Sequence, residues 1–104
     1  MLDKLAAIEE KFEQINQQLF DPDVVSDIEK YKKLMQETKH LTPIVEKYRE
    51  LKKAQNDYNE AKMMLDEGGL DKDFKEMAQL ELSENAEIIE KAQEELKILL
   101  LPRD

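Results

Sequence analysis

The stretch that decides the fold is residues 26–65, SDIEKYKKLMQETKHLTPIVEKYRELKKAQNDYNEAKMML. Apolar and aromatic side chains recur in it every three or four residues, which places them along one face of an α-helix. The members of this stripe are Ile28, Tyr31, Leu34 or Met35, Thr38, Leu41, Val45, Tyr48, Leu51 or Lys52, Gln55, Tyr58, Ala61 and Leu65. The stretch therefore predicts one long amphipathic helix over about residues 27–66.

Pro43 interrupts this helix near its middle. Proline has no amide donor and its ring crowds the preceding turn, so a proline inside a helix bends or ends it. Thr42 is placed to cap a second helix that would begin at Pro43. The stripe keeps its phase across the proline, however, since Leu41 and Val45 are four residues apart. We expect one long helix kinked near Pro43, with two abutting helices as the alternative.

The ends of the long helix carry their own signals. Ser26-Asp27-Ile28-Glu29 fits a capping box, in which the serine oxygen accepts from a helical amide and Glu29 reaches back to the serine amide. Glu29 and Lys33, four residues apart, are expected to form an ion pair. Gly68-Gly69 follows the helix, and glycine adopts the left-handed conformation that closes the last carbonyls.

Two shorter helices are predicted on either side of the long one. Leu2, Leu5, Ile8, Phe12, Ile15 and Leu19 share one face over about residues 2–20, before Pro22. A third helix is predicted over about residues 72–101, capped by Asp71 or Asp73 and ended by Pro102. Its stripe is formed by Phe74, Met77 or Ala78, Leu82, Ala86, Ile89, Ala92 or Gln93, Leu96 and Leu99 or Leu100. Short connections make neighbouring helices antiparallel. The predicted fold is all-α, with residues 1–104 forming a single helical domain, an antiparallel three-helix bundle or coiled coil.

Composition narrows the function classes. The chain has 39% charged residues and no cysteine, so it offers no thiol nucleophile, thiolate metal site or disulfide. No apolar run approaches the roughly 18 residues of a membrane span, and the acidic, amphipathic start is unlike a signal peptide. We expect a cytoplasmic protein that contacts no membrane.

Few side chains in the sequence are suited to catalysis or to metal binding. His40 is the only histidine, Ser26 is assigned to a cap, and Ser83 has no neighbouring base. The many carboxylates lie on helix surfaces, where no pocket is predicted to shift their acidity. We expect no catalytic, cofactor-binding or metal-binding residues, and therefore no enzyme activity in this chain.

Charge is spread unevenly along the chain. The formal net charge is −9, yet residues 28–53 hold eight basic and four acidic side chains. Such a basic segment is typical either of a solvated helix surface beside acidic neighbours or of a site for RNA or an acidic protein. The candidate partner-binding residues are Lys30, Lys32, Lys33, Lys52 and Lys53. Sequence-specific DNA binding is not expected from so acidic a chain.

Four stretches add a resemblance. They are Met1-Leu-Asp-Lys-Leu5, Asp21-Pro-Asp-Val-Val25, Leu41-Thr-Pro-Ile-Val-Glu-Lys-Tyr-Arg49 and Leu99-Leu-Leu-Pro-Arg-Asp104. In this order and spacing they resemble the N-terminal helical domain of bacterial class I peptide chain release factors, over essentially the whole chain. The start and the stretch after Pro43 are more similar to the release factor 1 branch than to the release factor 2 branch.

The resemblance implies a parent protein that recognises the UAA and UAG stop codons and triggers release of the nascent peptide. In that family, a proline-x-threonine motif reads the codon and a glycine-glycine-glutamine motif supports hydrolysis. Here Pro43 is followed by Ile44 and Val45, and Gly68-Gly69 by Leu70, so both activities are expected to lie outside this chain. The resemblance also implies contacts with the stalk base of the large ribosomal subunit and with the remaining domains of the factor.

Two other classes compete with this interpretation. A free-standing coiled-coil scaffold or chaperone would grip clients with apolar helix tips, and an exposed apolar cluster at one end would favour it. A tRNA-gripping helical arm would be basic on its working surface, whereas residues 54–104 hold fourteen acidic and six basic side chains.

Overall fold

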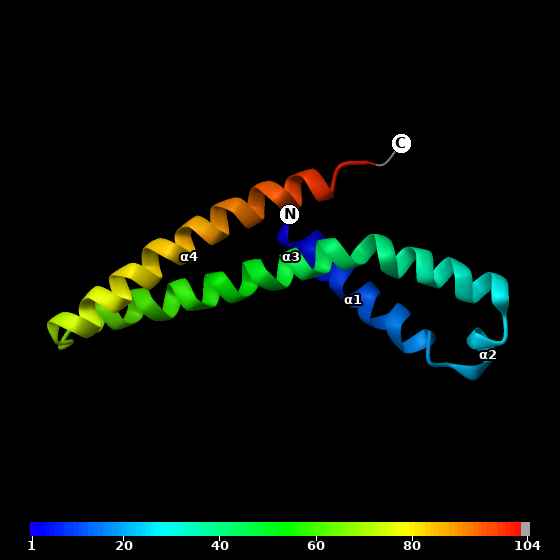
Figure 1. The fold of residues 1–104 in the computed structure, drawn as a ribbon, viewed down its shortest axis with the longest axis horizontal. Helices are drawn as coiled ribbons and strands as arrows, with labels where there is room; N and C mark the ends of the chain where they lie inside the picture. The colour runs from blue at the N-terminus through cyan, green and yellow to red at the C-terminus, as the bar shows by residue number, and fades with distance from the viewer. Residues whose placement is uncertain (103–104) are drawn as a thin grey trace. The chain divides into compact units, whose positions relative to one another are not determined.

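In the computed structural model, which describes residues 1–102, the chain is built of helices, with no strand among those residues. The helices are α1 (Leu2–Gln18), α2 (Pro22–Val25), α3 (Ile28–Glu67) and α4 (Lys72–Leu99) (Figure 1). The predicted all-α class with a long middle helix is confirmed. The chain divides into two compact units, Met1–Glu46 and Lys47–Asp104.

The first unit holds α1, α2 and the beginning of α3. Within it α1 and α3 run in opposite directions (Figure 1). Its buried side chains are all apolar: Leu5, Ile15, Val24, Leu41, Ile44 and Val45. An ion pair of 2.7 Å between Lys11 Nζ and Glu37 Oε1 also joins α1 to α3. Because Lys11 is largely exposed and Glu37 is partly exposed, burial of the apolar face contributes most to this pairing.

The turn between α1 and α3 differs from the prediction. It contains the four-residue helix α2, capped by Asp21, whose side chain accepts a hydrogen bond from the Asp23 amide at 2.9 Å. Ser26 closes α2 and donates its hydroxyl to the Asp23 carbonyl. Asp27 therefore caps α3, accepting from the Lys30 amide at 3.2 Å. The predicted capping box at Ser26 is wrong, because that serine is the C-cap of α2 and Asp27 caps α3.

Helix α3 passes through Pro43 without a break. Thr42 remains helical and donates its hydroxyl to the Thr38 carbonyl at 2.7 Å, so it does not cap a new helix. The alternative of two abutting helices is wrong. Pro43 leaves the Lys39 carbonyl without its usual donor. Both residues are exposed on α3, where water can bond a carbonyl that lacks a helical donor. The bend expected at Pro43 stays a prediction.

The second unit pairs the later part of α3 with α4 as an antiparallel hairpin (Figure 1). Its seam contains small side chains that are almost completely buried, namely Ala54 and Ala61 on α3 and Ala78 and Ala92 on α4. On each helix the two alanines are spaced as in a heptad repeat. Small side chains allow closer approach of helix axes, while Leu51 and Leu96, also buried, supply apolar area.

One polar side chain enters this seam. Asn85 is only 8% exposed and lies seven residues from both Ala78 and Ala92. Its side-chain amide donates to the Glu81 carbonyl at 2.8 Å, which offsets the cost of removing the amide from water. A polar residue at a buried heptad position favours one register between paired helices.

The connection between α3 and α4 has the predicted glycine chemistry. Gly68 and Gly69 have φ angles of 72° and 78°, in the left-handed region that favours glycine. Asp71 then caps α4, accepting a hydrogen bond from the Phe74 amide at 3.0 Å. Of the two predicted caps, Asp71 is the one used. No helix among the described residues is long and apolar enough to cross a membrane.

Candidate partner-binding surface

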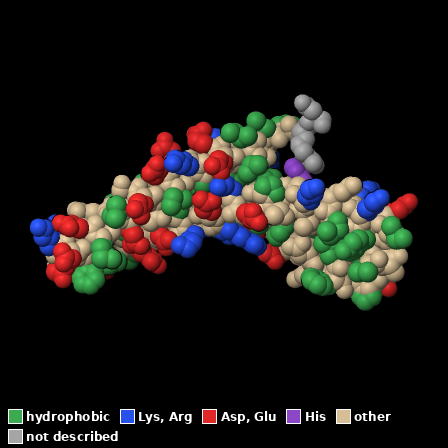
Figure 2. Space-filling model, viewed as in Figure 1, with side chains coloured by type: hydrophobic (Ala, Val, Ile, Leu, Met, Phe, Trp, Pro, Cys, Tyr) green, Lys and Arg blue, Asp and Glu red, His purple; other side chains and the backbone are tan. Residues whose placement is uncertain are grey.

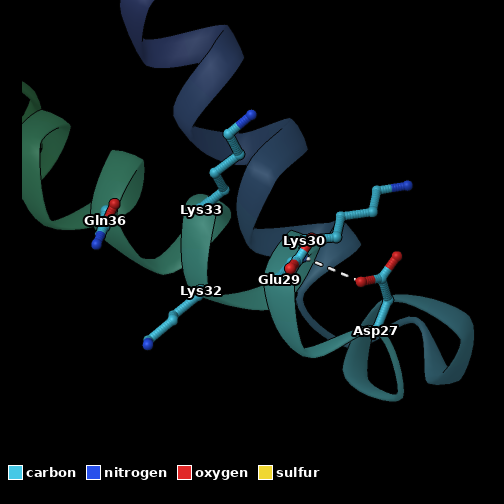
Figure 3. Close-up of a pocket in the computed structure, with 6 residues that line it drawn as sticks. All are labelled: Asp27, Glu29, Lys30, Lys32, Lys33 and Gln36. Atoms are coloured by element: carbon cyan, nitrogen blue, oxygen red, sulfur yellow. Dashed lines mark hydrogen bonds between the residues drawn. The ribbon is translucent and has the colours of Figure 1, made fainter.

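Three of the five predicted partner-binding residues lie together in the first two turns of α3. Lys30, Lys32 and Lys33, here called the α3 lysines, line a shallow open pocket with Asp27, Glu29 and Gln36 (Figure 3). All six side chains are exposed. Within residues 1–102 no carboxylate forms an ion pair with an α3 lysine, so the predicted pair between Glu29 and Lys33 is not formed.

The α3 lysines do not all point the same way. Figure 3 shows Lys30 and Lys33 directed to one side of the helix and Lys32 directed to the other. Lys39 lies seven residues beyond Lys32 and therefore shares its side of α3. The beginning of α3 thus presents two basic edges.

Lys52 and Lys53, the other two predicted residues, belong to the second unit and are engaged there. The ammonium group of Lys52 lies 4.5 Å from the centre of the Tyr48 ring, a cation–π contact. Lys53 Nζ lies 3.0 Å from Asp57 Oδ2, and this hydrogen bond raises the pKa of Lys53. Lys52 and Lys53 therefore already have partners, whereas the α3 lysines form no ion pair within residues 1–102 and remain the candidate site.

A different lysine, Lys47, forms a junction within the second unit that the sequence did not predict. Lys47 Nζ lies 2.8 Å from Glu50 Oε2 and 2.7 Å from Glu95 Oε2. The hydrogen bond that Lys47 donates to Glu50, followed by the one it donates to Glu95, raises the pKa of Lys47 above its ordinary value of 10.5. The spacing of Lys47 and Glu50 was visible in the sequence, but Glu95 is brought there only by the pairing of α3 with α4.

The first unit also has an apolar groove that the residue spacing did not predict. The groove is lined by Asn16, Leu19, Phe20, Tyr31, Met35 and Thr38, and it is called the apolar groove below. Phe20 is 86% exposed and Met35 is 44% exposed. Figure 2 shows hydrophobic side chains gathered on the surface at the end of the first unit where α2 lies. A signal was present, because Leu34 and Met35 competed for one place in the stripe and the structure leaves Met35 outward.

Catalytic and metal-binding chemistry gain no support from the arrangement. His40, the one histidine, is half-buried on α3. Among residues 1–102 no three histidine, aspartate or glutamate side chains are grouped so as to hold a metal ion. The described surface offers cations and apolar side chains, which bind partners by charge and burial.

The chain is similar to known proteins over nearly its whole length. Residues 8–104 match the family model described as the PCRF domain. Over all 104 residues the chain is 46% identical to peptide chain release factor 1 of Alkaliphilus oremlandii, 42% to that of Bacillus licheniformis and 40% to that of Alkaliphilus metalliredigens. No solved structure matches the chain. The chain spans 29% of the length of each of these relatives. A family model that covers residues 8–104 leaves little of the sequence unmatched, and the chain therefore belongs to the PCRF domain family.

Proposed function

We propose that this chain is an accessory domain of a peptide chain release factor and helps the factor bind the ribosome when translation terminates at UAA and UAG codons. The relatives that match it over its whole length are named peptide chain release factor 1. The contact would be made in the cytoplasm with the stalk base of the large subunit. The remaining domains of the factor would read the codon and support hydrolysis.

The observation that carries the proposal is a group of lysines without ion-pair partners in an otherwise acidic chain. The formal charge is −9, yet the exposed α3 lysines have no ion-pair partner among residues 1–102. Exposed cations near one helix end strengthen attraction to phosphates or acidic protein surfaces and accelerate association. Lys52 and Lys53 contribute less in this proposal, because Tyr48 and Asp57 already hold them.

The chain itself is proposed to lack release activity. Pro43 precedes Ile44 and Val45, and the glycine pair is followed by Leu70, so neither family motif is present in this sequence. Gly68 and Gly69 have a structural use instead, since their positive φ angles close α3 before α4. The domain would act by positioning the factor on the ribosome.

The test uses a chimera in which this chain replaces the aligned segment of the Alkaliphilus oremlandii factor. Lys30, Lys32 and Lys33 are changed together to glutamate, and ribosome affinity is measured over a range of salt concentrations. We expect affinity to fall about tenfold at low salt, with the difference shrinking as salt rises. The matched control changes Lys62, Lys72 and Lys75 to glutamate, which alters net charge equally in the second unit. Equal affinity of the chimera and the α3-lysine variant at every salt concentration contradicts the proposal.

A second candidate function is a client-gripping scaffold or chaperone. It is favoured by the exposed apolar side chains near the α1–α3 connection, namely Phe20, Val25 and Ile28. Such a protein would suppress aggregation of a chemically denatured client at stoichiometric amounts. Replacing Phe20 and Ile28 with serine would abolish that suppression, whereas no suppression by the unaltered chain excludes this function.

A further inference from the structure

The apolar groove of the first unit leaves hydrophobic area in water. One wall comprises Asn16 of α1 with Leu19 and Phe20, which follow that helix, and the α3 wall comprises Tyr31, Met35 and Thr38. Phe20 lies just beyond α1 and exposes 86% of its surface, while Tyr31 and Met35 remain partly exposed. Val25 and Ile28, also exposed, add apolar area near the same connection. Contiguous exposed apolar area of this kind marks sites for other molecules.

The shape of the apolar groove indicates which kind of partner structure can bind in it. Its walls are antiparallel helices of one unit (Figure 1), and the surface between two such helices can hold the ridge of a third. A helix bound in this way presents apolar residues three and four positions apart to the groove. Methionine adapts to varied apolar shapes, which suits Met35 to the middle of such a contact.

Two lysines lie beside the apolar groove and give one of its edges a positive charge. Lys32 lies three residues before Met35 and Lys39 lies four residues after it, so both neighbour Met35 on one side of α3. Neither lysine forms an ion pair within residues 1–102. The α3 wall of the groove therefore has a basic edge beside an apolar surface.

The surroundings disfavour a nucleic acid in this groove. Residues 1–46 hold ten acidic and six basic side chains, and Asp21 and Asp23 lie one and three residues after Phe20. A phosphate chain crossing the groove would meet these carboxylates as well as the lysines. A protein helix can place a few carboxylates opposite Lys32 and Lys39 and present neutral residues elsewhere.

We propose that the apolar groove binds one amphipathic α-helix of a partner protein, with that helix's apolar face against Phe20 and Met35 and its carboxylates beside Lys32 and Lys39. This inference goes beyond ribosome binding and does not depend on it. The specificity of the site lies in the combination of an apolar floor with one basic edge.

The experiment measures binding of two designed helical peptides to the chain by fluorescence anisotropy. Both peptides carry leucines three and four positions apart, and they differ only in one edge, which is glutamate in the first and lysine in the second. We expect the glutamate-edged peptide to bind at least about tenfold more tightly. Changing Lys32 and Lys39 to glutamate should reverse this preference.

Variants of the apolar surface test its part in the contact. Phe20→Ser combined with Met35→Ser should weaken the glutamate-edged peptide at least about tenfold. The matched control is Phe74→Ser combined with Met63→Ser, since these residues are also exposed but lie in the second unit. It should leave affinity unchanged, and circular dichroism checks that both double variants stay helical.

Four outcomes overturn the proposal. They are absence of binding by the glutamate-edged peptide, equal binding of the two peptides, equal effects of the groove and control variants, and displacement of the peptide by a short single-stranded RNA. Sedimentation equilibrium of the chain alone provides a fifth. A mass above 12.3 kDa that the groove variant returns to the monomer would assign the groove to a second copy of the chain.

Discussion

The ammonium group of Lys47, in the middle of α3, lies 2.7 Å from a carboxylate oxygen of Glu95 near the end of α4. Glu50, one turn along α3, holds the same ammonium group at 2.8 Å. The three side chains connect the paired helices of the second unit at the end away from the glycine turn. Because both carboxylates favour the charged amine, the pKa of Lys47 is raised.

Lys47→Met is therefore expected to lower stability in a pH-dependent way. The raised pKa means that Lys47 contributes fully below its ordinary pKa of 10.5, and that this contribution is lost as pH rises through the higher folded value. Urea unfolding midpoints of the two proteins should differ at neutral pH and converge above pH 10.5. Lys91→Met is the control, because among residues 1–102 Lys91 pairs with Glu87 alone, along α4, at 3.1 Å. An equal effect of the two substitutions would show that the junction adds nothing beyond a surface pair.

Ala61→Leu tests the close approach of α3 and α4. Ala61 is fully buried, so three added carbon atoms must displace neighbouring side chains. We expect the free energy of unfolding to fall by about 1–3 kcal/mol, measured with urea. Lys62→Leu, at the exposed neighbouring position, should change it by less than about 0.5 kcal/mol. Unchanged stability of the Ala61 variant would mean that the seam has room for a larger residue.

Gly68→Ala isolates the backbone conformation of the turn. A methyl group at Gly68 would meet no atom within 4 Å, so only the φ angle of 72° opposes the substitution. The free energy of unfolding should fall by about 1 kcal/mol for L-alanine. A synthetic chain with D-alanine, which favours positive φ, should gain about 0.4–1 kcal/mol. Equal stability of the two alanine forms would refute a left-handed residue at this position.

Two threonines of α3 should respond in opposite directions. Thr38 Oγ1 is buried without a hydrogen-bond partner in the described part of the chain, whereas the Thr42 hydroxyl donates to the Thr38 carbonyl. Thr38→Val removes an unsatisfied group while keeping the side-chain shape, so stability should rise by about 1 kcal/mol. Thr42→Val should lower it by about 0.5–1 kcal/mol. Thermal unfolding of the two variants measures both signs, and a loss on Thr38→Val would be the contrary result.

The sequence predicted the elements that depend on periodicity. The apolar stripes identified the three longer helices, and the glycine pair identified the turn before α4, because spacing and backbone freedom are local properties. Asp71 was one of two candidate caps, and choosing it required the geometry of its bond to the Phe74 amide.

Other features depended on packing and could not be predicted from spacing. Helix α2 is only four residues long, too short for a periodic signal, and its presence moved the α3 cap from Ser26 to Asp27. The candidate site was predicted in part. The α3 lysines are exposed as a cluster. The ion pair between Lys53 and Asp57 depends on side-chain rotamers, and the exposure of Met35 depends on which face of α3 packs against α1, so neither could be predicted from spacing.

The most direct test of the central claim is the concentration dependence of peptide release by the Alkaliphilus oremlandii chimera on stop-codon ribosomes. Lys30, Lys32 and Lys33 are changed together to glutamate, and the half-maximal factor concentration and maximal rate are compared with the unaltered chimera. An accessory binding domain predicts a rise of about tenfold in the half-maximal concentration with the maximal rate unchanged. A lower maximal rate at an unchanged half-maximal concentration would contradict the account, because it would place these lysines in the release step itself.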